Sequence, residues 1–164
     1  MSKHLQRDLD NLQRDLLALA SSVEEAIHKS IRSLQERHTV IARQVIDGDN
    51  IIDAEENHVE EECLKLLALH QPVAIDLRRI ASCLKINTEL ERMADLAEDI
   101  AERASALLDL PLRAVPAKLE QMANLTVAMV RQAIDSFVNL DLPLALHVCQ
   151  KDDEVDQLNV EIIG

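Results

Sequence analysis

The chain has 164 residues and a formal net charge of −13, with 48% hydrophobic residues but only 1% aromatic residues. This excess of acids argues against binding to nucleic acid or to anionic lipid, because both would be repelled. Two glycines, four prolines and few strand-forming residues favour long helices instead.

Residues 1–110 are expected to form one three-helix unit. Apolar residues recur every three or four positions from about residue 5 to 36, which places them on one face of a first helix. They are Leu5, Leu9, Leu12, Leu16, Leu19, Val23, Ile27, Ile31 and Leu34. A second helix is predicted over about 40–69. His70-Gln71-Pro72 is the next break, and because proline is tolerated in the first turn of a helix, a third helix is predicted over about 72–108.

Residues 117–164 are expected to form part of a second such unit, with helices over about 117–140 and 143–164. A weak internal repeat supports this, because Glu24-Glu25-Ala26-Ile27 matches Arg131-Gln132-Ala133-Ile134, 107 residues later. The predicted fold class is all-α, with tandem three-helix bundles of which the second lacks its last helix in this chain. We expect the uncovered face of that pair of helices to pack against another chain, as in a homodimer.

The third predicted helix carries an acidic stripe beside an apolar one, which holds Ile86, Leu90, Met93, Ala97, Ile100 and Ala104. Glu91, Asp95 and Asp99 follow one another at i, i+4 and i+8, so their carboxylates stack along one line. Like charges at this spacing destabilise an isolated helix by roughly 0.2–0.5 kcal/mol per pair. The stripe contains no lysine to relieve the repulsion, whereas a bound cation would turn it into coordination.

The second predicted helix supplies a matching row, because Asp49, Asp53 and Glu56 fall within about 60° of arc on it. If these helices form an antiparallel hairpin, residues whose numbers add up to about 141 lie level, which places Glu91 between Asp49 and Asp53. Ligands that are all oxygen favour the hard cations Mg²⁺, Ca²⁺, Mn²⁺ or iron. The alternative is the solvated face of an acidic protein that binds no metal.

Two segments around these rows resemble the PhoU family of phosphate-uptake regulators. Residues 70–80, His-Gln-Pro-Val-Ala-Ile-Asp-Leu-Arg-Arg-Ile, resemble the signature that opens the third helix of a PhoU repeat. Residues 91–102 resemble the run Glu-Arg-x-x-Asp-x-x-x-x-Ile-Ala-Glu that closes it. The resemblance extends over essentially the whole chain and implies two tandem three-helix bundles and a regulator that is not an enzyme.

The resemblance also implies metal binding through Glu/Asp-x-x-x-Asp motifs, to a divalent or trivalent ion such as iron, magnesium, manganese or zinc. The candidates in the first unit, with those from the motif before those from the hairpin register, are Glu91, Asp95, Asp99, Asp49, Asp53 and Glu56. In the second unit Asp152 and Asp156 match Asp49 and Asp53, 103 residues later. Their own partners would lie in the helix that this chain lacks.

By the same resemblance, the expected partners are a phosphate ABC transporter and a membrane sensor histidine kinase. Family members are thought to pass phosphate status from the first to the second and so to repress phosphate-starvation genes. We expect no nucleic acid and no direct membrane insertion, since no run approaches the ~20 apolar residues of a membrane span.

The location expected from the sequence is cytoplasmic. The chain begins with polar and charged residues rather than the apolar run of a signal peptide. Cys63, Cys83 and Cys149 are far apart and lie among apolar neighbours, which predicts buried and reduced thiols.

Two rival functions are weaker. A ferritin-like di-iron oxidase would use Glu-x-x-His motifs, and the chain has Glu25-x-x-His28 and Glu55-x-x-His58. The helical wheel directs Glu25 and His58 outward, as expected of solvated residues. A metal-free helical scaffold is the other alternative, in which the acidic rows serve only solubility.

Overall fold

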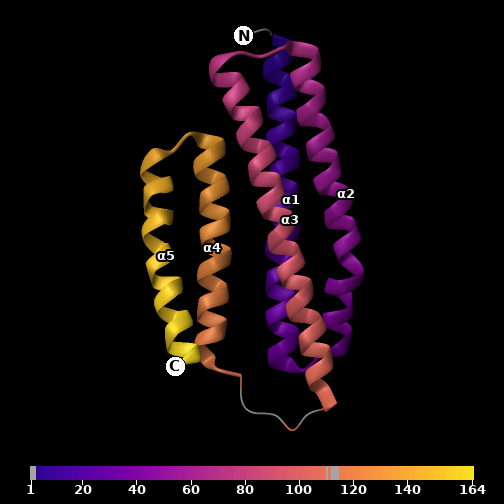
Figure 1. Cartoon of the computed structure of the whole chain (residues 1–164), viewed down its shortest axis with the longest axis vertical. Helices are drawn as coiled ribbons and strands as arrows, with labels where there is room; N and C mark the ends of the chain where they lie inside the picture. Colours follow the sequence, from indigo (N-terminus) through magenta and orange to yellow (C-terminus); the bar gives the residue numbers. More distant parts are fainter. Residues whose placement is uncertain (1–2, 110, 112–114) are drawn as a thin grey trace.

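Five long helices make up the part of the chain that the structure describes, residues 3–109, 111 and 115–164, and no strand occurs there. In this computed structural model, α1 (Lys3–Glu36), α2 (Thr39–His70) and α3 (Ala74–Ala106) form an up-down-up bundle that ends in the 3₁₀ turn η1 (Leu107–Asp109). A hairpin of α4 (Ala117–Asn139) and α5 (Leu142–Ile163) lies beside it (Figure 1). The all-α prediction is confirmed, and within the described residues the second unit consists of two helices.

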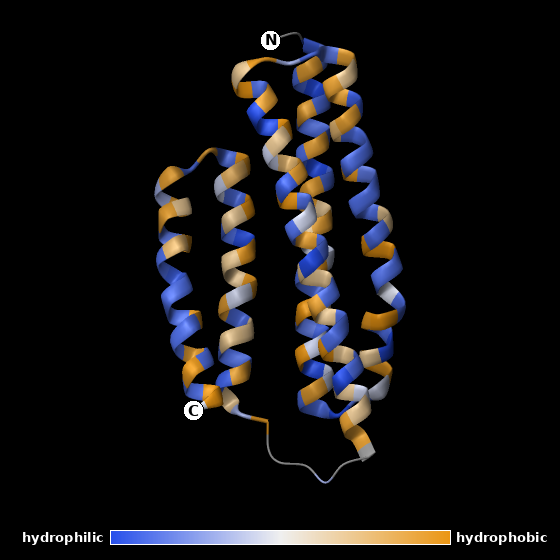
Figure 2. Cartoon of the chain, viewed as in Figure 1, coloured by the Kyte–Doolittle hydropathy of each residue, from blue (hydrophilic) through white to orange (hydrophobic). Residues whose placement is uncertain are grey.

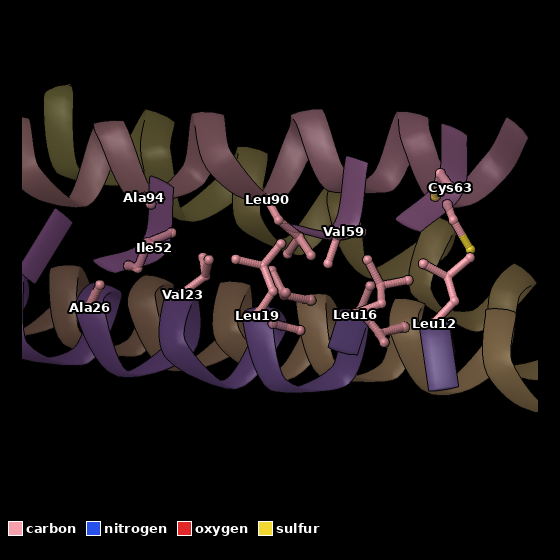
Figure 3. Packing of buried hydrophobic residues seen from close by; sticks show 14 of the residues in the cluster. Leu12, Leu16, Leu19, Val23, Ala26, Ile52, Val59, Cys63, Leu90 and Ala94 are labelled. Carbon is pink, nitrogen blue, oxygen red and sulfur yellow. The ribbon is translucent and has the colours of Figure 1, made fainter. Parts of the chain in front are cut away.

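The core of the bundle is built on the apolar stripe of α1. Leu12, Leu16, Leu19 and Val23 are at most 1% exposed. Figure 3 shows these side chains directed from α1 toward residues of α2 and α3, among them Leu90. Because the stripe keeps the 3.6-residue period over the whole helix, a single face of α1 packs against both neighbours. Elsewhere the helices alternate polar and apolar residues along their length (Figure 2).

The buried face of α3 is rotated from the one that its large apolar residues suggest. Ala94, Ala101 and Asn87 are at most 2% exposed, whereas Ile86 and Met93 are only half-buried and border a groove between α3 and α4. Of the predicted stripe, Leu90, Ala97 and Ala104 are buried, and Ile86, Met93 and Ile100 are only partly buried. Small side chains on the inner face let the α3 backbone approach α1 and α2, so alanines share this face with the larger Ile80 and Leu90.

The turn between α2 and α3 is longer than predicted. α2 ends at His70, Gln71 adopts a left-handed conformation with φ 43°, and α3 begins at Ala74 rather than at Pro72. The extra non-helical residues shift the level of α3 against α2. Asn87 hydrogen-bonds Glu56, so the numbers of two facing residues add up to 143 rather than 141.

Among the helices of the described residues, α1 is the main contact between the two units, because α4 packs on α1 and α5 packs on α4. The Arg131 guanidinium donates to the carboxylate of Glu24, which is 8% exposed, with Nε 3.1 Å from Oε2. Glu24 and Arg131 are equivalent positions of the repeat, 107 residues apart. A residue meets its own repeat equivalent only at the axis that relates the two copies, so this ion pair marks a pseudo-two-fold axis between the antiparallel helices α1 and α4.

Replacing Arg131 by methionine should loosen the second unit specifically. The Glu24 carboxylate would stay buried without its partner, so we expect a measurable loss of stability, which the exposure of Arg131 keeps below that of a fully buried ion pair. Thermal unfolding followed by circular dichroism measures the loss, and hydrogen exchange should quicken in α4 and α5 before α2. Arg43→Met, at an exposed arginine of α2, is the matched control. An equal loss in the control would contradict a role for the Glu24–Arg131 pair.

One face of α5 lies bare in the described part of the chain. Only Leu158 of this helix is buried, whereas Leu142, Leu146, Val160 and Ile163 are 56–78% exposed. At 100° per residue these four fall within about 100° of arc, and Cys149 falls on the same stripe. The prediction that all three cysteines are buried is therefore wrong for Cys149, which is exposed, because its apolar neighbours form a face that no third helix covers.

Cys63 and Cys83 do lie in the core, as expected. Both thiols are free. Burial raises the pKa of Cys63 to about 12 and that of Cys83 to about 11. Neither thiol is ionised at neutral pH, so both act as small apolar side chains in the packing.

Candidate metal centre

Acidic side chains of α2 and α3 face one another along the outside of the three-helix bundle. They come from one stripe on each helix, and the packing of α2 on α3 sets their distance. The α2 row contains Asp49, Asp53, Glu56 and Glu60, and the α3 row contains Glu91, Asp95 and Glu98. The structure thus sets the α2 row beside an α3 row in which Glu91 and Asp95 were predicted candidates and Glu98 was not.

Glu91 lies close enough to both rows for the negative charges of each row to act on its carboxyl group. Burial of its half-exposed side chain is the main cause that raises the pKa of this carboxyl. Negative charges then raise it further, those of Asp95, Glu56, Asp53 and Asp49 in that order. Three of these four charges belong to the other helix, so the rows interact across the interface and not only along each helix.

Asp49 and Glu98 mark the other end of the site. The pKa of Asp49 is raised by burial and then by the charges of Asp53 and Asp95. That of Glu98 is raised by burial and then by Asp49, Glu102, Asp95 and Asp53. When burial and like charge both raise the pKa of a carboxyl, a nearby cation stabilises its ionised form. The cation compensates for the lost solvation and neutralises the neighbouring negative charges.

Asn87 fixes the position of Glu56, and sequence reasoning did not select it. Its side chain is 1% exposed, and Nδ2 donates to the Glu56 backbone carbonyl at 3.0 Å and to Glu56 Oε1 at 2.7 Å. The pKa of Glu56 is raised by burial and then by the charges of Glu60 and Asp53. An asparagine inside an apolar stripe was the available indication, because a buried amide needs a polar partner on a neighbouring helix.

No basic residue neutralises the rows. None of the charges in the two rows forms an ion pair within the described residues. The rows are also not a finished coordination cage, because no group of three or more His, Cys, Asp and Glu residues in the described ranges is arranged to hold an ion. The donor set nevertheless fits a hard cation. Mg²⁺ in particular keeps several of its waters and takes only one or two carboxylates from a protein.

The structure does not bring every predicted ligand into these rows. Asp99 is exposed and is not among the charges that raise the pKa of the row carboxyls, whereas Glu98 takes part. Helical geometry explains the exchange, since at 100° per residue Glu98 lies about 20° from Glu91 and Asp99 about 80°. On α5, Asp152 and Asp156 are exposed, and no helix in the described chain faces them with a second row.

The two Glu-x-x-His motifs serve surface contacts. Glu25 lies 2.7 Å from Lys29 on the same helix. In the second motif His58 Nε2 lies 3.6 Å from Asp15 of α1, with 57% of the histidine side chain exposed. Neither motif contributes its residues to a shared internal site in the described chain, as a ferritin-like centre would require.

Comparison with known proteins shows which family this chain resembles. The family model described as PhoU domain matches residues 16–104 and 119–163. A curated relative from Aquifex aeolicus, a phosphate-specific transport system accessory protein PhoU homolog, is 38% identical over 93% of this chain and 69% of its own length. A homologue of the same name from Clostridium acetobutylicum is 34% identical over 99% of this chain and 74% of its own.

Solved structures agree in fold. The crystal structure of PhoU from Pseudomonas aeruginosa superposes with a TM-score of 0.90 at 31% identity, covering 96% of this chain and 76% of that one. The phosphate transport system regulatory protein PhoU from Streptococcus pneumoniae gives 0.88 at 28% identity, covering 96% and 74%. Since the family model and the relatives extend over both helical units, this chain belongs to the PhoU family.

Proposed function

We propose that this protein is a metal-binding regulator of phosphate uptake that acts as a cytoplasmic adaptor rather than as an enzyme. Relatives named as accessory or regulatory proteins of phosphate transport support the regulatory role. Within the described residues no helix has the length and apolar character needed to cross a bilayer. The adaptor would contact a phosphate ABC transporter and a sensor histidine kinase through its helix faces and repress phosphate-starvation genes.

The observation that carries the metal-binding part is the pair of unneutralised carboxylate rows. Repulsion between α2 and α3 at Glu91 opposes the packing of the two helices, and a cation between the rows would reverse its sign. Asp53 and Asp95 are exposed, so their side chains can rotate toward a shared ion without disturbing the core. We therefore assign the site to a hard cation such as Mn²⁺, Mg²⁺ or iron.

A metal-free helical scaffold is the second candidate. It is favoured by the finding that no three potential ligands in the described chain are already placed around one point. In that case the rows serve solubility and partner contacts, and the protein passes its signal through protein surfaces alone.

Elemental analysis separates these candidates. Protein dialysed against Mn²⁺ and then against metal-free buffer should retain bound metal, and Asp95→Asn should lower the metal content by more than half. Asp99→Asn is the control, because this nearby residue has the same chemistry but lies outside the rows. Equal metal content in wild type and Asp95→Asn would remove Asp95 from the site, and none in wild type would favour the scaffold.

The bare face of α5 is assigned to a homodimer contact. We expect the wild-type protein to sediment as a dimer, and Val160→Glu, a charge at a position 64% exposed in the single chain, to sediment as a monomer. Cys149 provides a second readout, since it should react slowly with a thiol reagent in the dimer and quickly in Val160→Glu. Val40→Glu, at a 57% exposed valine of α2, is the control. A monomeric wild type with a reactive Cys149 would contradict the assignment.

A further inference from the structure

One end of the three-helix bundle exposes a patch of large aliphatic side chains. The patch lies at the turn from α2 to α3, at the end of the bundle where the N-terminus lies (Figures 1 and 2). Its members are Leu69, Val73, Ile75 and Leu77, exposed by 68%, 76%, 64% and 44%. We call these four residues the apolar tip. Four large aliphatic side chains are thus exposed within nine positions of the chain, and exposed apolar surface gathered at one place on a protein marks a contact site.

The turn that bears the apolar tip is held in place from both sides. Leu66 and Ile80, just before and just after it, are at most 2% exposed and anchor the two helices in the core. His70 Nε2 lies 3.0 Å from Asp8 Oδ2, which ties the end of α2 to α1. The core at this end is thus already filled, and the tip residues project from a preorganised turn. A preorganised surface loses little entropy on binding.

The charge around the apolar tip is opposite to that of the chain. Residues 3–8 and 62–80, which form this end and include the Glu62 partner of Lys65, contain five Lys or Arg and three Asp or Glu, a net charge of +2. With the chain total of −13, the rest of the chain carries −15. Arg78 is exposed directly beside the patch. An end that is both aliphatic and cationic is complementary to a partner surface that is aliphatic and acidic.

We propose that the apolar tip is the docking surface of this protein for the phosphate transport complex, inserted end-on into an aliphatic cleft bordered by carboxylates. The proposal rests on the proposed function, which supplies the partner. A protein cleft fits better than a lipid surface for two reasons. The tip has no aromatic residue, the type that anchors proteins at a membrane interface, since the only phenylalanine is Phe137. The negative charge of the remaining chain would also repel anionic lipid.

The test uses the full-length protein and the membrane complex of the phosphate transport system from the same organism, in nanodiscs of phosphatidylcholine. Val73→Ser/Ile75→Ser should weaken binding about tenfold or more, as expected when apolar anchors at the centre of an interface are truncated. Val40→Ser/Ile51→Ser removes the same two side-chain types from α2 at 57% and 61% exposure and should leave affinity unchanged. Serine is a favourable N-cap, the position that Val73 occupies in α3, so the tip variant is expected to fold.

A charge variant tests the second half of the proposal. Arg78→Glu should weaken binding and flatten its dependence on salt, whereas Arg43→Glu, at an exposed arginine away from the tip, should do neither. If both tip variants bind the complex as tightly as the wild type does, the apolar tip is not the docking surface, and the proposed function stays intact. Wild type that does not bind the complex would overturn both. Binding to protein-free vesicles of phosphatidylglycerol, equally weakened by the tip variants, would replace the protein cleft with a lipid surface.

Discussion

Leu19→Ala is expected to lower the free energy of unfolding by about 3–4 kcal/mol, several times the loss from a surface substitution. Leu19 is completely buried in the middle of α1, where its side chain meets residues of α2 and α3 (Figure 3). Truncation removes the favourable burial of the side chain and leaves a cavity, and the tight α1–α3 interface can collapse only partly into it. Since this bundle also carries α4, the loss should unfold the whole chain cooperatively. Urea unfolding followed by circular dichroism measures it.

Leu17→Ala is the matched control, because Leu17 lies two residues away on the same helix and is 38% exposed. Its loss should stay near or below about 1 kcal/mol, the range of surface substitutions. Losses of similar size in the two variants would mean that the stripe of α1 does not form the core. A large loss in Leu19→Ala confined to α4 and α5 would show instead that α1 stabilises the second unit more than the first.

The buried residues of a helix are easier to predict from the sequence when the helix buries only one of its faces. α1 packs on α2 and α3 with its leucines and on α4 with a second side that holds Glu24, and the period of its leucines predicted the helix and the first of these sides. α3 packs on the core with one face and borders the groove toward α4 with another. Large apolar residues such as Met93 line that groove. Much of the inner face consists of alanines such as Ala94, which are less hydrophobic than the neighbouring large residues that the prediction selected. Cys149 shows the converse, because apolar neighbours do not bury a residue when no helix packs on their face.

The candidate site was predictable in composition but not in detail. Periodicity alone aligned the acidic residues into one row on each helix, and antiparallel packing brought the rows together. The level of one row against the other depended on where α3 begins after Pro72, which the sequence leaves ambiguous because proline is accepted both before and within a first turn. Glu98 rather than Asp99 joins the row because eight residues overshoot two helical turns and seven do not. Asn87 could be placed only once its partner helix was known.

Glu91→Gln is expected to change stability in opposite directions without and with metal. In the metal-free protein the substitution removes a negative charge whose pKa is raised, by burial and then by Asp95 and three carboxylates of α2, above its ordinary value of 4.5. A raised pKa means that the folded state binds the proton more tightly than the unfolded state. Stability from this group is therefore greatest at low pH and is lost as pH rises through the folded pKa. At neutral pH glutamine should stabilise the metal-free protein by about 1 kcal/mol, the sum of several like-charge pairs.

With Mn²⁺ present, the same substitution should destabilise relative to wild type. An ion that binds only the folded state adds about 2.7 kcal/mol when its concentration is 100 times its dissociation constant, and the neutral amide should forfeit most of this. Thermal unfolding at neutral pH, with EDTA and with Mn²⁺, measures both signs in one experiment. Glu89→Gln is the control, because Glu89 is exposed on α3 but is not among the charges that act on the rows, and it should change neither value. Stabilisation by Glu91→Gln in both buffers would mean that the rows only repel one another and hold no ion, whereas a reversal of sign requires a cation bound between α2 and α3.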